Sequence, residues 1–219
     1  MAISKLNFNS LNVTPAANEA IGFDSGADDL ETGSGGGSMV FIKKLTASSS
    51  ATLSFVDGTD GVVLDNTYKE YFFTFNNMHP ASSGVSFLFN MSVDSGSNYN
   101  VTKTSTYFRA YHYEDDSGAA LGYDGDGDLA QSTDFQVLTQ AIGAENDECA
   151  SGYVHLFNPS STTFVKHYIT NFNRYHPSNI TVNEFAAGYG NTTSAVDAVQ
   201  FKMSSGNIDA GTITLYGIT

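Results

Sequence analysis

From residue 40 to the C-terminus the sequence repeats one pattern, in which short runs rich in aromatic and β-branched residues are separated by turn residues. Ten such runs occupy residues 40–46, 51–56, 70–76, 85–93, 107–114, 135–140, 153–158, 164–170, 199–204 and 212–218. Several alternate with a period of two, and in the fourth run Phe87, Phe89 and Met91 share one face. This alternation is typical of strands that have one face on a core and the other in water.

Turn residues mark the breaks between the runs, as at Asp57-Gly58, Ser83-Gly84 and His79-Pro80. Helical periodicity is missing, and the best candidate for a helix, residues 181–190, is short and ends in glycine. Ten short strands joined by turns predict an all-β chain folded as an antiparallel β-sandwich of jelly-roll type. The edges of a sandwich must be hidden from other chains, and oligomerisation is one way to hide them.

The first 38 residues differ in composition from the rest and end in the flexible Gly/Ser linker 33–38. Scattered apolar residues precede the linker: Leu6, Phe8, Leu11, Val13, Ile21 and Phe23. A solvating tail needs no such anchors, so they favour an extended N-terminal arm that orders on a neighbouring subunit over a disordered tail. The predicted organisation is an arm and linker over residues 1–38 and a β-sandwich domain over residues 39–219.

The net charge of −14 excludes two classes of partner. Nucleic acid and anionic membrane surfaces are both densely negative, and the nine lysines and arginines form no basic patch that could hold phosphates.

The start of the chain lacks the continuous apolar stretch of a signal peptide. We therefore expect a protein made in a cytoplasm and released, if at all, by a route such as lysis. The single cysteine, Cys149, has acidic neighbours and is interpreted as structural.

The densest acidic cluster, "YDGDGD", places Asp124, Asp126 and Asp128 at alternating positions. An EF-hand loop that starts at Asp124 would need glycine at position six and glutamate at position twelve, where this chain has Leu129 and Phe135. Two alternatives stay open: a looser calcium site completed by backbone carbonyls or a further carboxylate, and a solvated loop between strands. We predict the exposed loop, with weak calcium binding at most and no other cofactor.

Motifs of known catalytic sites are missing, and the chain is predicted not to be an enzyme. His155 and His167 lie within strand patterns without a clustered partner, so both are interpreted as packing residues. Glycoside hydrolysis by two carboxylates stays an alternative, because that pair is recognised by its separation in space. Carbohydrate binding is another, because the twelve tyrosines can act as platforms for sugar rings.

The C-terminal stretch, "DAVQFKMSSGNIDAGTITLYGIT" at residues 197–219, resembles the end of a large group of tailed-bacteriophage virion structural proteins. Members of that group end in a similar F-x-S-x-G-N-x-x-x-G-x-x-x-L-Y-G-I/L pattern. A looser resemblance, in "TYKEYFFTFNNMHPAS" and "SGYVHLFNPS" among others, extends over residues 39–219. In physical terms Gly206-Asn207 favours a hairpin turn with positive φ, Gly211 permits a bulge, and Gly217 lets another backbone come close.

The resemblance implies a non-enzymatic virion structural protein, either a capsid decoration or a tail or fibre component, anchored by its N-terminal arm. The partners it implies are further copies of the chain, in a homotrimer, and other virion proteins such as the major capsid or tail proteins. The alternative is a receptor- or glycan-binding module of a phage tail appendage, with a host surface glycan as partner. A polysaccharide-degrading enzyme is the third hypothesis.

Overall fold

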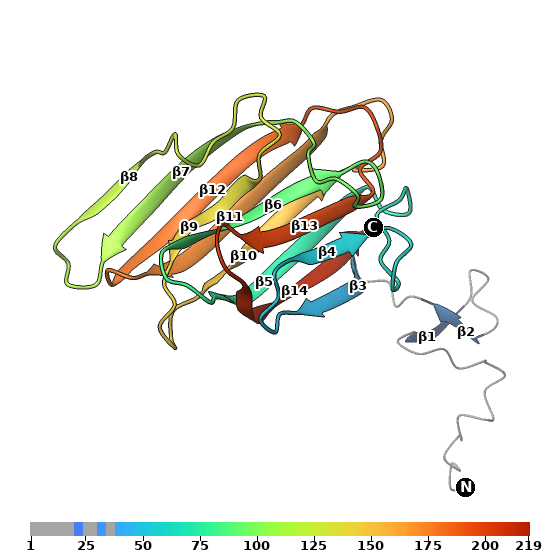
Figure 1. Ribbon diagram of the computed structural model, residues 1–219. Helices are drawn as coiled ribbons and strands as arrows, with labels where there is room; N and C mark the ends of the chain where they lie inside the picture. The colour runs from blue at the N-terminus through green and yellow to red at the C-terminus, as the bar shows by residue number, and fades with distance from the viewer. Residues whose placement is uncertain (1–19, 24–29, 34–37) are drawn as a thin grey trace, which may run out of the picture. The chain divides into compact units, whose positions relative to one another are not determined.

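The computed structural model describes residues 20–23, 30–33 and 38–219, and the chain divides into two compact units (Figure 1). The first unit, Met1–Val40 with Thr219, contains an antiparallel pair of short strands, β1 (Ala20–Phe23) and β2 (Leu30–Gly33). Ile21 and Phe23 of the predicted arm lie on β1. The other four predicted anchors lie outside the described residues, so the arm stays a prediction.

The second unit, Phe41–Ile218, has two antiparallel sheets packed as a sandwich. Eight of its strands form a jelly roll: β3 (Met39–Thr46), β4 (Leu53–Val56), β5 (Glu70–Pro80), β6 (Val85–Ser92), β9 (Gln136–Ile142), β10 (Ala150–Phe157), β13 (Ala198–Met203) and β14 (Ile208–Ile218). One sheet contains the order β3-β14-β5-β10, and the other is β4-β13-β6-β9. In chain order these are strands 1-8-3-6 and 2-7-4-5, the arrangement of two Greek keys. The prediction of a jelly-roll sandwich is confirmed.

Four more strands lengthen the larger sheet beyond β10, and we call them the extension: β7 (Lys103–Tyr113), β8 (Ala119–Tyr123), β11 (Lys166–His176) and β12 (Ile180–Gly190). They arise from two insertions, one between β6 and β9 and one between β10 and β13. The sheet continues as β10-β11-β12-β7-β8, with β8 at its edge (Figure 1). The smaller sheet ends at β9, which packs on β11 and β12.

Residues 181–190, the best sequence candidate for a helix, lie in strand β12, and no helix occurs among the described residues. The strand pairs over its whole length with β7, from Ile180 opposite Tyr113 to Gly190 opposite Lys103. Eleven residues paired on both sides outweigh the local composition that suggested a helix. Strand β8 was not predicted from the sequence, because its residues are small and exposed.

The core between the sheets is built from phenylalanine rings. Phe201 of β13 lies at its centre, and its ring centroid is 4.9 Å from that of Phe75 and 5.5 Å from that of Phe73. Both pairs meet edge to face, an arrangement favoured by the charge distribution of aromatic rings. Phe55, Phe87 and Phe89 complete the shell around Phe201. All six rings are buried, and the faces predicted by alternation therefore form the core.

The terminal motif fits this core with two corrections. Gly206 has the predicted positive φ of 70°, but its turn joins β13 of the smaller sheet to β14 of the larger one, so the strands are not a hairpin. Gly211, with φ of 122°, lies at a shift in the pairing of β14 with β5, which confirms the predicted bulge. A Cβ on Gly217 would lie 2.3 Å from the ring of Tyr68, so the close approach comes from a side chain and not from another backbone.

Candidate functional site

The inner face of the extension, which points toward the smaller sheet, carries buried charged residues. Lys103 on β7, Lys166 and Arg174 on β11 and Glu184 on β12 are each at most 2 % exposed. They point inward because side chains two residues apart in a strand lie on the same face, and each has a buried neighbour at that spacing. Arg174, for example, follows the buried Phe172 by two residues. A buried charge is stable only when it is paired or hydrogen-bonded, so the partners of these residues decide what the face can do.

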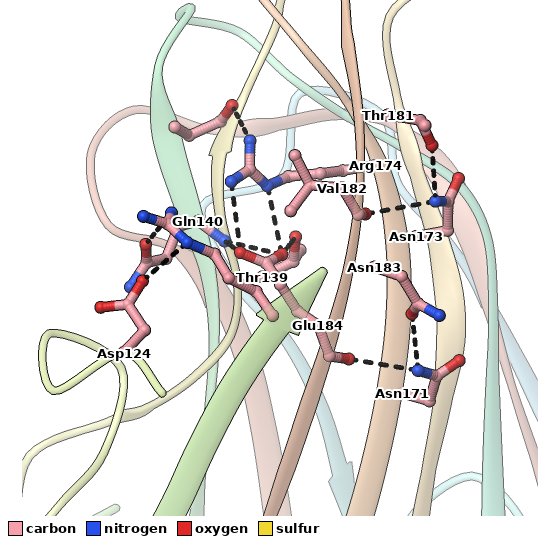
Figure 2. A network of polar contacts seen from close by, with 12 residues as sticks. Asp124, Thr139, Gln140, Asn171, Asn173, Arg174, Thr181, Val182, Asn183 and Glu184 are labelled. Carbon is pink, nitrogen blue, oxygen red and sulfur yellow. Dashed lines mark hydrogen bonds and ion pairs between the residues drawn. The ribbon is translucent and has the colours of Figure 1, made fainter. Parts of the chain in front are cut away.

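Arg174 and Glu184 form a buried ion pair with two contacts (Figure 2). Arginine Nε lies 3.1 Å from Glu184 Oε2, and Nη2 donates to Oε1 at 3.2 Å. The remaining guanidinium nitrogen, Nη1, donates to the carbonyl of Ala141 at 3.0 Å. The Thr139 hydroxyl donates to the same carboxylate from β9. The pair therefore fixes β11 and β12 against the edge of the smaller sheet.

Arg109 on β7 continues this network toward water. Its Nε lies 3.1 Å from Asp124 Oδ2, and its Nη1 donates to Gln140 Oε1 at 3.4 Å. The side chain is 39 % exposed, whereas that of Asp124 is only 10 % exposed. Arg109 and Arg174 are the only arginines in the sequence. The fold brings both of them to the wall of one pocket.

A pocket of about 280 Å³ lies beside these two arginines at the end of the extension. Its other walls come mainly from Tyr111 and Tyr113 of β7, His176 of β11 and Ser178 of the following turn. A second pocket of about 320 Å³ adjoins it, with Tyr113 and Ser178 as shared walls.

The setting of His176 favours its neutral form. Burial lowers the pKa of its imidazole, and the positive charges of Arg174 and Arg109 lower it further. The backbone amide of Ser178 donates to Nδ1 at 3.0 Å, so the ring proton of the neutral form is on Nε2. Nothing among the described residues accepts a hydrogen bond from Nε2, which leaves this group as a donor at the wall of the pocket.

Lys103 is buried farther along β7, and it is held by oxygen acceptors. Its Nζ donates to Asn90 Oδ1 at 2.5 Å and to the carbonyl of Val101 at 2.7 Å. Desolvation lowers the pKa of Lys103 to about 7, so the amine loses its proton far more easily than a lysine in water. Its role in the fold is to satisfy Asn90, whose amide in turn donates to Tyr99 and Thr133 carbonyls.

The acidic loop that contains Asp124, Asp126 and Asp128 lies between β8 and β9 and folds back over the inner face of β7. The Asp124 carboxylate pairs with Arg109, and that of Asp128 accepts from the Tyr123 hydroxyl. Asp126 contributes its backbone amide, which donates to Asp124 Oδ1 at 3.1 Å. Two of the three carboxylates therefore already have partners within the protein.

Within residues 20–23, 30–33 and 38–219, no three His, Cys, Asp or Glu side chains are grouped as a metal ion requires. Weak calcium binding stays a prediction, and a calorimetric titration of the wild type and Asp126→Asn tests it. A micromolar affinity that the substitution abolishes would overturn it. No helix of the described chain is long and apolar enough to span a membrane.

The opposite, outer face of the larger sheet carries a second candidate feature. Two adjacent rows of cross-strand neighbours run over it: Tyr216, Phe72, His155, Ile169, Ala187 and Thr106 in one, and Thr214, Thr74, Tyr153, Asn171, Phe185, Phe108 and Tyr123 in the other. Neither row contains Asp, Glu, Lys or Arg. Ile169, Phe108 and Tyr123 are 46 %, 41 % and 62 % exposed. We call these two rows the outer aromatic face.

Sequence reasoning missed both features, although signals for them exist. The two arginines lie in similar contexts, "YFRAYHY" and "NFNRYHP", and this likeness could have linked them, although β12 separates their strands in the sheet. The partner of His155 is Glu70, whose Oε2 lies 2.8 Å from Nε2. That carboxylate is 85 residues away in sequence and comes close only because β5 pairs with β10.

Comparison with known proteins gives no relative from which a function could be transferred: no family model, no curated protein and no solved structure matches this chain. The class of this protein therefore rests on its fold, which is an all-β jelly roll with a four-strand extension.

Proposed function

We propose that this protein is a non-enzymatic structural subunit of a tailed-bacteriophage virion, a capsid decoration or a tail or fibre component, that assembles with copies of itself. The outer aromatic face is the observation that carries the proposed assembly of copies. The jelly roll supports it, because this fold recurs in viral capsid domains and in lectins. The C-terminal Leu-Tyr-Gly-Ile pattern, which resembles that of phage structural proteins, is the only link to a virion.

Charge explains why a second copy of this chain is the partner we assign to the outer aromatic face. Each copy carries a net charge of −14, so two copies repel one another over most of their surfaces. The two rows that form this face bear no Asp, Glu, Lys or Arg, and the Glu70 carboxylate at their border is paired with His155, so repulsion is weaker there. Interface cores are depleted in charged residues and enriched in aromatic ones, as this face is.

The rings on this face already stack on one another within the single chain. Phe108 and Phe185 stack with their centroids 4.9 Å apart, and Phe72 and Tyr153 stack at 5.2 Å. Rings already fixed in one rotamer lose little conformational entropy on binding, which favours association. Large contiguous apolar patches on a protein surface are typical of interaction sites.

The test is the mass of the full chain in solution, measured by light scattering at micromolar concentration. We expect a homotrimer for the wild type and a monomer for Ile169→Glu, which introduces a charge at the centre of the face. The matched control is Thr162→Glu, a charge added at an exposed loop position away from the face. A monomeric wild type, or a trimer that survives Ile169→Glu, would overturn assembly through this face.

Residues 1–38 are proposed to join the subunit to the particle. Their deletion is expected to leave a folded sandwich, because β3 begins at Met39 and every core ring lies after it. The truncated chain is expected to keep its circular dichroism spectrum and to be lost from purified phage particles. Incorporation at the wild-type level would show that the arm has no role in attachment.

A further inference from the structure

We propose that the pocket between Arg109, Tyr111, Tyr113 and His176 binds an uncharged sugar ring, so that this chain carries a glycan site in addition to its role in assembly. The pocket opens on the inner face of the extension, opposite the outer aromatic face. Association of copies through the outer face therefore leaves it accessible. The proposal does not depend on the virion assignment, because it rests only on the chemistry of the walls.

The walls combine the two kinds of group that a sugar ring requires. Tyr111 and Tyr113 give the pocket apolar ring surface, and their rings meet edge to face with centroids 5.9 Å apart at an interplanar angle of 81°. Sugar rings are amphipathic, with C–H groups that pack on aromatic rings and hydroxyls that need hydrogen bonds. Small-molecule sites typically have such apolar walls with a few directed polar groups.

Donors with no partner in the described chain lie on the polar side of the pocket. Arg109 uses Nε for Asp124 and Nη1 for Gln140, which leaves the two N–H groups of Nη2 without an acceptor among the residues described. His176 presents Nε2–H, because its Nδ1 already accepts from the Ser178 amide. Arginine held by a carboxylate is a fixed planar donor, and such a donor is suited to the neighbouring hydroxyls of a sugar.

The charge balance selects a neutral ring over an acidic one. Arg109 is paired with Asp124 and Arg174 with Glu184, so the four charges cancel, and His176 adds none because its pKa is lowered. The adjoining pocket contains Glu114 and Asp115, which repel a carboxylate. The net charge of −14 repels acidic sugars at longer range as well.

Size suggests one ring in each of two adjoining pockets. The first pocket, about 280 Å³, lies just below the range for small-molecule sites, which begins at about 300 Å³. The second pocket, about 320 Å³, shares the walls Tyr113 and Ser178 with the first. A disaccharide is therefore expected to bind more tightly than either of its single rings.

The experiment is saturation-transfer-difference NMR on the full chain with D-glucose, D-galactose, D-mannose, maltose, lactose and D-glucuronic acid as separate probes. At least one neutral hexose is expected to bind, with a dissociation constant on the order of 1 mM, because a single ring makes few contacts. The corresponding disaccharide is expected to bind at least threefold more tightly, and glucuronic acid at least tenfold more weakly. If only free hexoses bind, the ligand is a soluble sugar. If the disaccharide binds more tightly than its single rings, the ligand is a glycan.

Two variants test the location. Tyr113→Ala removes one wall, and Ser178→Trp fills the pocket from an exposed turn position without removing a buried contact. Each is expected to reduce binding at least tenfold while the melting temperature stays close to that of the wild type. The matched control is Tyr189→Ala, at the other end of the extension on β12, which is expected to bind as the wild type does.

Three results would overturn the proposal: no signal from any neutral sugar, binding that persists in Ser178→Trp, or glucuronic acid binding more tightly than glucose. The last would replace the neutral ligand by an anion held by the two arginines.

Discussion

The jelly roll and its extension share one continuous sheet, but the inner face of that sheet carries apolar side chains in the jelly roll and charged side chains in the extension. On the jelly-roll strands the inner face is apolar, and Phe73 and Phe75 of β5 pack on Phe201 across the sandwich. On the extension the same face carries Arg174 and Glu184, both completely buried. Strand length does not explain the difference, because β5, β7, β11 and β12 each have eleven residues.

The difference follows from what covers each region. The jelly-roll strands face a second sheet, whose side chains exclude water and require apolar neighbours. The smaller sheet ends at β9, whose Thr139 and Ala141 contact the ion pair, and beyond this edge the face of β7 is covered by the acidic loop, in which Gly127 lies against the ring of Tyr107. A loop has backbone groups that must be hydrogen-bonded, so the surface beneath it is most stable when it offers polar partners.

The comparison teaches that buried polar groups in this protein act mainly as positioning contacts. Replacing a buried ion pair by apolar residues is often neutral or stabilising, so the pair contributes little to stability as such. Its geometry is specific, however, since Arg174 reaches Glu184 and the Ala141 carbonyl only in one arrangement of β9, β11 and β12. We infer that the extension is held in place by directional contacts and the jelly roll by packing.

The largest effect is expected in the jelly-roll core. Phe201→Ala removes the ring that contacts five others and is expected to lower the free energy of unfolding by about 4 kcal/mol, since it leaves a cavity that the surrounding rings cannot fill. Urea denaturation measures the loss. Hydrogen exchange is expected to rise in strands of both sheets together, and a rise confined to β13 would contradict a single cooperative core.

Removal of one partner of the buried pair is expected to have the next largest effect. Glu184→Gln leaves Arg174 as an uncompensated buried charge and is expected to cost about 3 kcal/mol in the same denaturation experiment. Hydrogen exchange is expected to rise first in β7, β8 and β12, and only later in the jelly roll.

The double variant Arg174→Met with Glu184→Leu is the control for that experiment. It removes both charges and is expected to recover stability to within about 1 kcal/mol of the wild type. Failure of this rescue would show that the pair contributes stability and not only position, and the contrast between the two regions would then be lost.

Lys103 makes the stability of the extension depend on pH. Its pKa is about 7 when folded against 10.5 in the unfolded chain, so between these values the unfolded chain binds a proton that the folded chain releases. The stability that this group contributes therefore rises with pH through that window and is lowest below about pH 7. Between pH 7 and pH 9 the wild type is expected to gain about 2 kcal/mol relative to Lys103→Met.

Urea denaturation at the two pH values measures this gain, and the difference between variants removes contributions from other groups. The control Lys44→Met removes an exposed lysine of β3 and is expected to follow the wild-type pH profile. Parallel profiles for the wild type and Lys103→Met would show that water reaches Lys103 in the folded chain.

The smallest effect is expected where the loop meets the extension. A Cβ on Gly127 would lie 2.5 Å from the ring of Tyr107, so Gly127→Ala is expected to displace the loop and to cost about 1–2 kcal/mol. Gly125→Ala is the matched control two residues away, because nothing lies within 4 Å of its Cβ position. Hydrogen exchange of residues 124–132 measures the displacement, and equal exchange in the two variants would mean that Gly127 does not hold the loop.

Much of the jelly roll was predictable because its information is local. Period-two alternation identified Phe87, Phe89 and Met91 as core residues, and all three are completely buried. The same alternation assigned Asn90 to a wet face, yet Asn90 is also completely buried. Its cover comes from the segments at Tyr99 and Thr133, whose carbonyls accept its amide, and no pattern within β6 indicates that they lie there.

The candidate site was less predictable than the fold. The acidic loop was found from its spacing, but its partner Arg109 is fifteen positions upstream of Asp124 and lies on another element. The pocket proposed to bind a sugar joins residues of β7 and β11 that are more than sixty positions apart in sequence. Strand β12 was not among the predicted strands, and its residues 181–190 were only the best of the weak helix candidates, because a segment this short is ambiguous when the two strands beside it are unknown.

The sequence by itself determined which residues share a face in most of the strands, and with that the sandwich that they form, although β8 and β12 were not among the ten strands it predicted. Only the tertiary structure decided which of the two faces is covered. In β11 it buries Lys166 and exposes Ile169, the reverse of what polarity alone suggests. The physical reason is that the period of a strand is a local property of the chain, whereas burial depends on the sheet or loop that packs on it from elsewhere in the sequence.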